Sequence, residues 1–190
     1  MNDLTKQAIA ASLTKLLLDR PITRITVKDI CADCDVNRQT FYYHFQDIYD
    51  LLFWIFKRNI VDFFRERNLN PMDLNGYVHA LFDFCKNNAR IVRHAYNPAN
   101  RILYETAFRD ATEPILLHRI AQYENSHLVS KEDLNLLISF YAFSASSLLF
   151  RWVESGMPDS FQASFAKYCV LLDESVNALL LKLAGGTGGA

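Results

Sequence analysis

A cluster of polar and aromatic side chains between residues 37 and 45 carries groups that suit nucleic-acid chemistry. An arginine can donate two hydrogen bonds to guanine O6 and N7, and a glutamine can pair with adenine. Tyrosine and histidine suit phosphate oxygens, which fix a protein's register on DNA without reading its sequence. Threonine, with a methyl and a hydroxyl, can meet either a thymine methyl or a phosphate. The residues of the cluster that we expect to face DNA are Arg38, Gln39, Thr40, Tyr42, Tyr43 and His44.

The sequence around this cluster predicts two short helices joined by a tight turn. Thr26 precedes the first helix as its N-cap, and Asp29 completes a capping box three residues later. That helix ends near Cys34, and Asp35 tolerates the left-handed conformation of a turn. Asn37 then caps the second helix. This order is that of a helix-turn-helix, whose second helix lies in the DNA major groove.

The helical period divides the second short helix into two faces. Val36, Phe41 and Phe45 are spaced to pack inward against the first helix of the chain. The polar cluster falls on the opposite face, where no core is expected. Thr26 and Lys28, at the start of the preceding helix, add further groups for phosphate. Any one of these side chains could equally be half-buried or solvated, and their combination favours a DNA-facing surface.

The composition indicates a globular protein without a general attraction to nucleic acid. The 190 residues are 51% hydrophobic and 22% charged, with a net charge of −1. In residues 1–48, six basic side chains are matched by six acidic ones. We therefore expect a local DNA-binding patch with modest non-specific affinity.

Only six glycines and five prolines interrupt the chain, and the 3.6-residue hydrophobic period predicts an all-α fold. We expect a helix-turn-helix head at residues 1–46, an effector-binding and dimerisation bundle at 47–184 and a flexible tail at 185–190. The nine expected helices span approximately residues 4–18, 27–34, 37–45, 47–67, 71–88, 89–96, 101–125, 130–156 and 160–183.

The N-terminus lacks the pattern of a signal peptide. The least polar stretch, Leu134–Phe150, contains one asparagine and four serines and is shorter than the roughly 20 apolar residues of a membrane span. We expect a helix that is buried in a core or between subunits, no membrane partner and a cytoplasmic protein.

The segment ITVKDICADCDVNRQTFYYHFQDIYDLL resembles the DNA-binding signature of TetR-type transcriptional regulators, with its T-[LF]-Y-x-H-F motif. The resemblance covers residues 5–55 closely, and beyond them only the all-helical layout agrees. It implies a homodimeric DNA-binding regulator whose C-terminal bundle receives a ligand. It maps Thr40, Tyr42 and His44 onto motif positions, and the variable, sequence-reading positions fall on Arg38, Gln39 and Tyr43.

Two residues depart from the family pattern: Asp35 replaces the usual turn glycine, and Ile48 replaces a lysine that commonly meets a phosphate. The stretches FYYHFQDIYDLLFWIF and FYAFSASSLLFRWVESGMPDS also resemble the subgroup of dihydroxyacetone-kinase operon regulators. In that subgroup a partner protein can carry the small-molecule signal, so the effector implied here is a small molecule or a protein.

Aromatic residues recur at helical spacing in the bundle, which suits an apolar pocket or plain core packing. The candidates for an effector pocket are Phe53, Phe56, Tyr77, Phe82, Tyr104, Phe108 and Tyr141. The two last helices look apolar on more than one face, which favours a four-helix dimer interface over a core within one subunit. The candidates for that interface are Phe143, Ser147, Phe150, Phe165, Leu172 and Val176.

No catalytic, cofactor or metal site is predicted. Cys31 and Cys34 have the spacing of a zinc half-site but no second pair, so we interpret them as core filler. G-x-S-x-G, P-loop and G-x-G-x-x-G motifs do not occur. We expect a non-enzymatic regulator on a palindromic operator, with double-stranded DNA, a second copy and an effector as partners. The alternatives are a helical co-regulator of this fold with little DNA affinity, which Ile48 favours, and a helical enzyme.

Overall fold

The computed structural model describes residues 2–66 and 74–186. Within these residues the fold is all-α, as predicted, with nine α-helices and three 3₁₀-helices. The 3₁₀-helices are η1 (Ile22–Arg24), η2 (Pro98–Asn100) and η3 (Ser126–Leu128). The α-helices are α1 (Asn2–Asp19), α2 (Val27–Asp33), α3 (Arg38–His44), α4 (Ile48–Glu66), α5 (Leu74–Asn87), α6 (Ala89–Ala95), α7 (Arg101–Ile120), α8 (Lys131–Glu154) and α9 (Ser160–Gly186).

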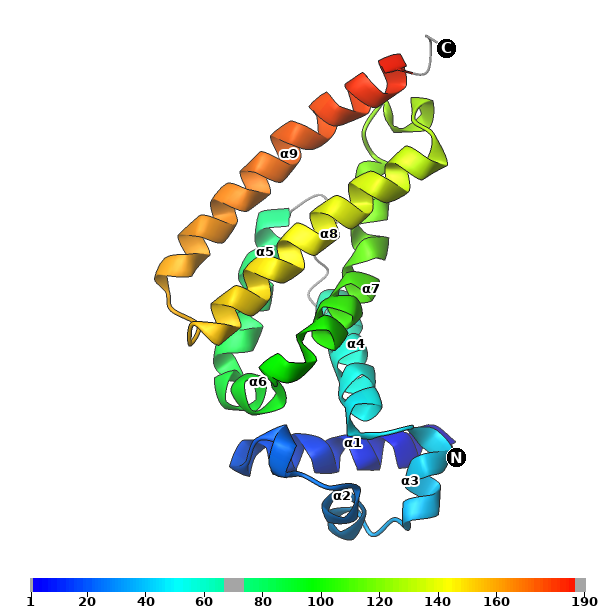
Figure 1. Ribbon diagram of the computed structural model, residues 1–190, viewed down its shortest axis with the longest axis vertical. Coiled ribbons are helices and arrows are strands. Elements are labelled where there is room, and N and C mark those ends of the chain that lie inside the picture. The colour runs from blue at the N-terminus through cyan, green and yellow to red at the C-terminus, as the bar shows by residue number, and fades with distance from the viewer. Residues whose placement is uncertain (1, 67–73, 187–190) are drawn as a thin grey trace.

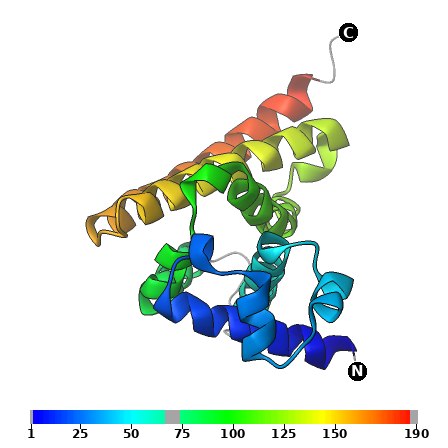
Figure 2. The same ribbon diagram turned by 60° about the horizontal axis from the view of Figure 1, so that its bottom comes forward.

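The helices form a head of α1–α3 at one end and a body of α4–α9 (Figure 1). α4 leads from the head into the body, and α8 and α9 run antiparallel along the side of the body farthest from the head (Figures 1 and 2). Two boundaries differ from the prediction. α7 ends at Ile120 because residues 121–125 form turns, and α9 continues to Gly186, two residues into the expected tail.

Side-chain caps explain where the helices begin. The Thr26 hydroxyl accepts the Asp29 N–H at 3.2 Å, and the Asp29 carboxylate accepts the Thr26 N–H at 2.9 Å. This is the predicted capping box of α2. The Ser130 hydroxyl accepts the Asp133 N–H at 3.0 Å and caps α8 in the same way. Gly156, with a φ of 87°, follows the end of α8.

The turn between α2 and α3 depends on one residue in the left-handed conformation. Asp35 has a φ of 52°, as expected from the sequence. The Val36 N–H donates to the Cys31 carbonyl at 3.0 Å, and the Cys34 N–H donates to the Ile30 carbonyl at 3.1 Å. These bonds satisfy carbonyls that the end of α2 would otherwise leave unpaired.

α1 holds the head and the body together. Its residues Ile9, Leu13 and Leu17 are almost completely buried in a core that includes the head and the adjacent part of the body. At the carboxyl end of α1, a ring nitrogen of His94 on α6 lies 2.8 Å from the Leu17 carbonyl oxygen. α6 therefore contacts a carbonyl in the last turn of α1. Carbonyl groups in a last turn have few donors within their own helix.

The body contains two packed regions. Beside the head, Trp152 of α8 is fully buried, with its ring 4.2 Å from that of Phe82. Farther away, α7, α8 and α9 enclose a second core that includes Leu172 and Val176. Across α8 and α9, the hydroxyls of Tyr141 and Ser175 lie 2.5 Å apart.

α8 is the one helix among the described residues that is long and apolar enough to cross a membrane. In its most apolar window half of the residues are buried within the protein. Long core helices of soluble proteins can be as apolar as a membrane span. α8 packs against α7 and α9, as a core helix does.

We expect Asp35→Val to lower the free energy of unfolding by about 1–2 kcal/mol, because a β-branched residue is strained at positive φ. Asp35→Gly should leave stability unchanged or raise it, because glycine adopts this conformation freely. Urea unfolding of both variants beside the parent chain measures the difference. Equal stability of the valine and glycine variants would contradict the strain argument.

Candidate nucleic-acid interface and ligand cavity

One face of α3 is anchored to the head. The Asn37 side-chain oxygen accepts the Thr40 N–H at 2.7 Å and the Thr40 hydroxyl at 3.0 Å, which fixes the start of the helix. Phe41 is fully buried, and the Phe45 ring lies 5.9 Å from it and 5.8 Å from Trp54 of α4. The opposite face of α3 is consequently held in a defined position.

That opposite face is exposed and polar at its tips. Arg38 and Gln39 are exposed in the first turn, and Tyr42 and Tyr43 are 58% and 77% exposed. Each tyrosine therefore presents a large apolar and hydrogen-bonding surface to solvent. The division of α3 into an inner and an outer face agrees with the sequence pattern.

The remaining residues predicted for the interface lie at its margins. Thr40 and His44 are half-buried, and the His44 ring meets the Tyr43 ring edge-on at 5.0 Å. Lys28 is exposed in the first turn of α2. Thr26 is exposed too, although its hydroxyl already takes part in the capping box. Contact of these side chains with phosphate stays a prediction.

The charges of the head are partly neutralised within it. Lys15 of α1 pairs with Asp33 at 2.6 Å, and Arg20 pairs with Asp29 at 3.2 Å. Arg38 forms no ion pair within residues 2–66 and 74–186. Two of the acids that bring the net charge of the head near zero are thus already paired with cations of the head. The outer face of α3 keeps the positive charge of Arg38.

The structure at the start of α4 explains why an apolar residue, Ile48, occupies this position. Asp47 accepts the Asp50 N–H at 2.8 Å, and Asp50 accepts the Gln46 N–H at 2.9 Å, so two carboxylates cap this helix. Ile48 is half-buried against the core of the head. The side chain serves packing here, and residues 46–50 contain two acids and no cation.

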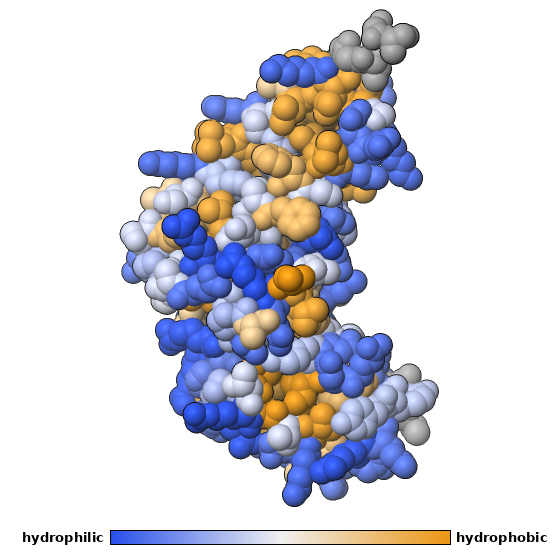
Figure 3. Space-filling view, viewed as in Figure 1, coloured by the Kyte–Doolittle hydropathy of each residue, from blue (hydrophilic) through white to orange (hydrophobic). Residues whose placement is uncertain are grey.

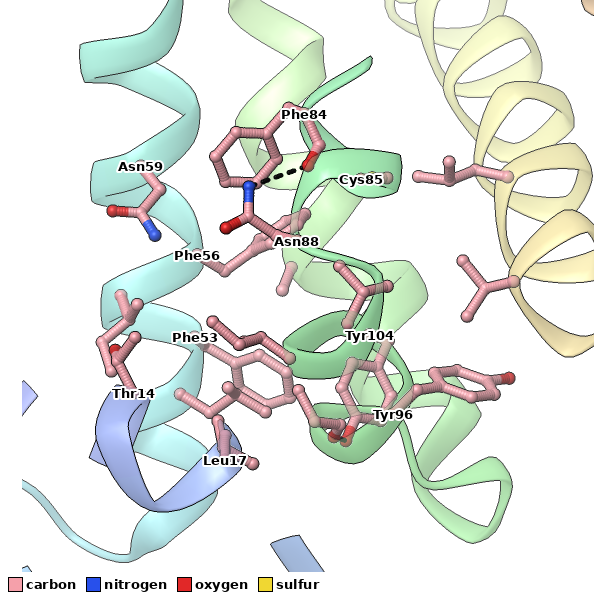
Figure 4. Close-up of a pocket in the computed structure, with 18 of the residues that line it drawn as sticks. Thr14, Leu17, Phe53, Phe56, Asn59, Phe84, Cys85, Asn88, Tyr96 and Tyr104 are labelled. Atoms are coloured by element: carbon pink, nitrogen blue, oxygen red, sulfur yellow. Dashed lines mark hydrogen bonds between the residues drawn. The ribbon is translucent and has the colours of Figure 1, made fainter. Parts of the chain in front are cut away.

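A cavity of about 520 Å³ lies between α1 and the body helices α4–α8 (Figure 4). Its volume falls within the usual range of small-molecule sites, about 300–1,000 Å³. Phe53 and Phe56 of α4 and Tyr104 of α7 form aromatic walls. Thr14 and Leu17 of α1 also line it, so a molecule in the cavity would touch a helix of the head.

Both tyrosine hydroxyls beside the cavity are already engaged. The Tyr104 hydroxyl donates to the Ala95 carbonyl at 2.6 Å, and the Tyr96 hydroxyl donates to the Glu154 carboxylate at 2.6 Å. Burial is the main cause that raises the pKa of each tyrosine above its ordinary value. The two rings therefore present apolar surface to the cavity.

The structure separates the seven side chains predicted for an effector pocket. Those that line the cavity are Phe53, Phe56 and Tyr104. Those buried in the core beside the head are Phe82 and Phe108, whereas Tyr141 lies in the second core. The side chain of Tyr77 lies outside the described residues. Effector binding by any of them stays a prediction.

The polar residues of the cavity, Asn59 and Asn88, were not predicted from the sequence. The aromatic repeats that suggest a pocket do not point to amides within otherwise apolar helical stretches. Asparagine is a poor residue for a helix interior, and Asn59 in the middle of α4 was the available signal.

The six residues predicted for a dimer interface fall into two groups. Phe143 and Ser147 are exposed on α8. The other four are at most 6% exposed within one protomer: Phe150, Phe165, Leu172 and Val176. These four fill the cores of a single subunit, because α8 and α9 each bury one apolar face against their own chain.

Cys31 and Cys34 lie on the inner side of α2, and burial raises the pKa of both thiols. The Cys34 thiol lies 3.1 Å from the Ile30 carbonyl oxygen. No cluster of three metal-binding side chains occurs in the described part of the chain.

The capping box predicts an acid dependence of stability. The hydrogen bond from the Thr26 N–H, and then that from its hydroxyl, hold the pKa of Asp29 below its ordinary value of 3.8. This contribution is complete above the unfolded pKa and is lost as pH falls through the lower folded pKa. The thermal midpoint of Asp29→Asn should lie below that of the parent at pH 7, and the difference should shrink below about pH 4. Glu124→Gln, at an exposed turn, is the control; a difference independent of pH contradicts this expectation.

Two family patterns match the chain. Residues 7–54 match "Bacterial regulatory proteins, tetR family", and residues 73–173 match "Transcriptional regulator C-terminal region". A curated relative, the HTH-type dhaKLM operon transcriptional activator DhaS of Lactococcus lactis subsp. lactis (strain IL1403), is 27% identical over 105 residues. The aligned part is 55% of this chain and 49% of that protein, so it spans about half of the relative.

A solved structure described as "Dihydroxyacetone kinase operon activator DhaS" shares the fold, with a TM-score of 0.55. The match has 21% identity and covers 94% of this chain and 96% of that one. The C-terminal pattern covers more than half of the chain, and the tetR pattern covers α2 and α3 and most of α1. The chain therefore belongs to the TetR family of transcriptional regulators, whose N-terminal helix-turn-helix binds DNA, and is not an enzyme.

Proposed function

We propose that this regulator acts in the cytoplasm as a homodimer on a palindromic operator, under the control of an effector bound by the body. The observation that carries the proposal is the outer face of α3, which is anchored on one side and exposed on the other. In a dimer, the two α3 helices would enter successive major grooves about 34–36 Å apart.

The chemistry of α3 suggests how the operator is read. Arg38 and Gln39, in the first turn, would contact base edges, because arginine and glutamine match guanine and adenine. Tyr42, Tyr43 and His44 would contact phosphates from the rest of the helix. The exposed cation of α2, Lys28, adds a phosphate contact beside them.

An exposed apolar stripe supports dimerisation through α8 and α9. On α8, Leu136, Phe140 and Phe143 follow the helical period and are 69%, 61% and 49% exposed. On α9, Leu171 and Leu181 are 64% and 52% exposed. Figure 3 shows apolar side chains gathered over the part of the body where these helices run. Exposed apolar side chains that gather on neighbouring helices are typical of an interface with another protein.

The position of the cavity supports control by an effector. It is lined by α1, which belongs to the head, and by α8, which carries the proposed subunit interface. A molecule that fits the cavity better in one arrangement of these helices would shift the population toward it. The spacing of the two α3 helices would then change with effector binding.

The names of the relatives suggest activation rather than repression. The curated relative and the similar structure are each named as an operon activator, DhaS. The rival function is a co-regulator that binds protein and has little DNA affinity. The two carboxylates at the start of α4, Asp47 and Asp50, favour that rival, because they would oppose phosphate at this point.

DNA binding is tested by a gel shift with the DNA that flanks the protein's own gene. Arg38→Ala should weaken specific binding by about 5- to 150-fold, the effect of about 1–3 kcal/mol for a bidentate base contact. Arg151→Ala, at an exposed position on α8, is the matched control and should bind as the parent does. No salt-sensitive shift with the parent chain would favour the co-regulator instead.

Dimerisation is tested by light scattering coupled to size-exclusion chromatography. Phe140→Glu should convert the dimer to monomers, because it places a charge in the centre of the apolar stripe. Leu4→Glu alters a side chain on α1 that is 71% exposed, and it should leave the dimer intact. A parent chain that is monomeric at micromolar concentration would refute the homodimer.

A further inference from the structure

The polar groups of the cavity restrict the chemistry of its ligand. None of the described residues that line it is a lysine, arginine or histidine. Its one acid, Asp62, lies 3.5 Å from the Arg58 guanidinium and is already paired. A ligand anion would therefore lose its hydration without gaining a cationic partner, at a large cost in binding free energy.

Two amides are the polar side chains best placed to hold a ligand. Asn59 of α4 and Asn88, between α5 and α6, extend toward each other across the cavity (Figure 4). The Asn88 amide nitrogen donates to the Phe84 carbonyl at 2.8 Å, which turns its side-chain oxygen toward the open space. That oxygen is an acceptor, and the side chain of Asn59, which is exposed, forms no hydrogen bond with the described residues.

The rest of the wall is apolar and largely aromatic. Phe53 and Phe56 contribute rings from α4, and Tyr104 contributes its ring from α7 while its hydroxyl is occupied. Aromatic rings pack well against other rings in offset or edge-on arrangements. The cavity thus combines an apolar body with two neutral amides, and its one carboxylate, Asp62, is paired with Arg58.

We propose that the effector of this cavity is an uncharged, ring-containing small molecule with one hydrogen-bonding group, held between Asn59 and Asn88. This inference rests on the proposed effector control and specifies its ligand. The apolar body of the molecule lies against the aromatic walls, and its polar group donates to the Asn88 oxygen. The same molecule contacts Thr14 and Leu17, so its occupancy is transmitted to the head through α1.

A matched series of probes tests the ligand class on the full chain. N-phenyl-1-naphthylamine, whose fluorescence rises in apolar sites, serves as the reporter, and three biphenyls of similar size compete with it. Biphenyl-4-carboxamide should displace the reporter at the lowest concentration. Biphenyl-4-carboxylate should be at least about tenfold weaker because its anion is unpaired, and 4-methylbiphenyl should be about three- to tenfold weaker because it lacks the hydrogen bond.

Variants locate the binding. Ala107→Phe, which fills the cavity from α7, should reduce reporter binding by at least about tenfold. Asn88→Leu should remove the preference for the carboxamide over 4-methylbiphenyl and leave the affinity for 4-methylbiphenyl nearly unchanged. Asn59→Leu should reduce the same preference. Because residue 59 is exposed, this variant should fold even if Asn88→Leu does not. Asn87→Leu, exposed at the end of α5 and outside the cavity lining, is the matched control.

The outcomes separate this inference from the proposed regulatory function. Carboxylate binding equal to or tighter than carboxamide binding, at a site sensitive to Ala107→Phe, would overturn the ligand class. The ligand class would also be overturned if Ala107→Phe left reporter binding unchanged, or if the reporter did not bind at all. In each case the gel shift with the parent chain reports DNA binding independently. A chain that binds the carboxamide as described and shifts no DNA would refute the regulator and leave the ligand site standing.

Discussion

The burial of one face of α1 is the constraint on which the rest of the structure depends. The side chains of Ile9, Leu13 and Leu17 are almost completely buried. They belong to a core shared by the head and the adjacent part of the body. Moving the head relative to the body would require these side chains to be repacked, which is costly in a dense interior. The bond between His94 and the Leu17 carbonyl adds a polar contact at the same junction. The head and the walls of the cavity therefore belong to one packed unit, which α1 joins.

The protein separates two chemistries that would interfere if mixed. Charged and hydroxyl-bearing side chains face outward on α3, where water hydrates them and where we propose that phosphate binds. The cavity carries rings and two neutral amides, and its tyrosine hydroxyls are consumed by internal bonds. Within the head, the acids that would weaken a DNA-binding surface include Asp29 and Asp33, and both are paired with cations of the head. A nearly neutral chain can thus present a locally positive helix.

Local features were predictable from the sequence, and features that depend on several helices were not. The caps at Thr26 and Asn37 and the turn at Asp35 involve neighbours within five residues, so residue type and spacing determine them. The two faces of α3 follow from its period. The cavity instead depends on gaps between six helices, which no periodicity reveals. Phe150 shows the limit best: the sequence places it on an apolar helix, but only packing decides whether its ring meets its own subunit or another.

α8 connects these observations, because its two faces serve different neighbours. One face carries Leu149 and Val153 into the cavity wall, next to the buried Trp152. The other carries the exposed stripe that includes Phe140 and Phe143. A helix that is apolar all round satisfies the composition of a membrane span, a core helix and an interface helix alike, and the pattern of exposure separates these roles. A ligand that shifts the inner face of α8 must also shift its outer face, since a helix moves as a rigid element. Pairing of two such outer faces would therefore join the ligand sites of two subunits mechanically as well as their heads.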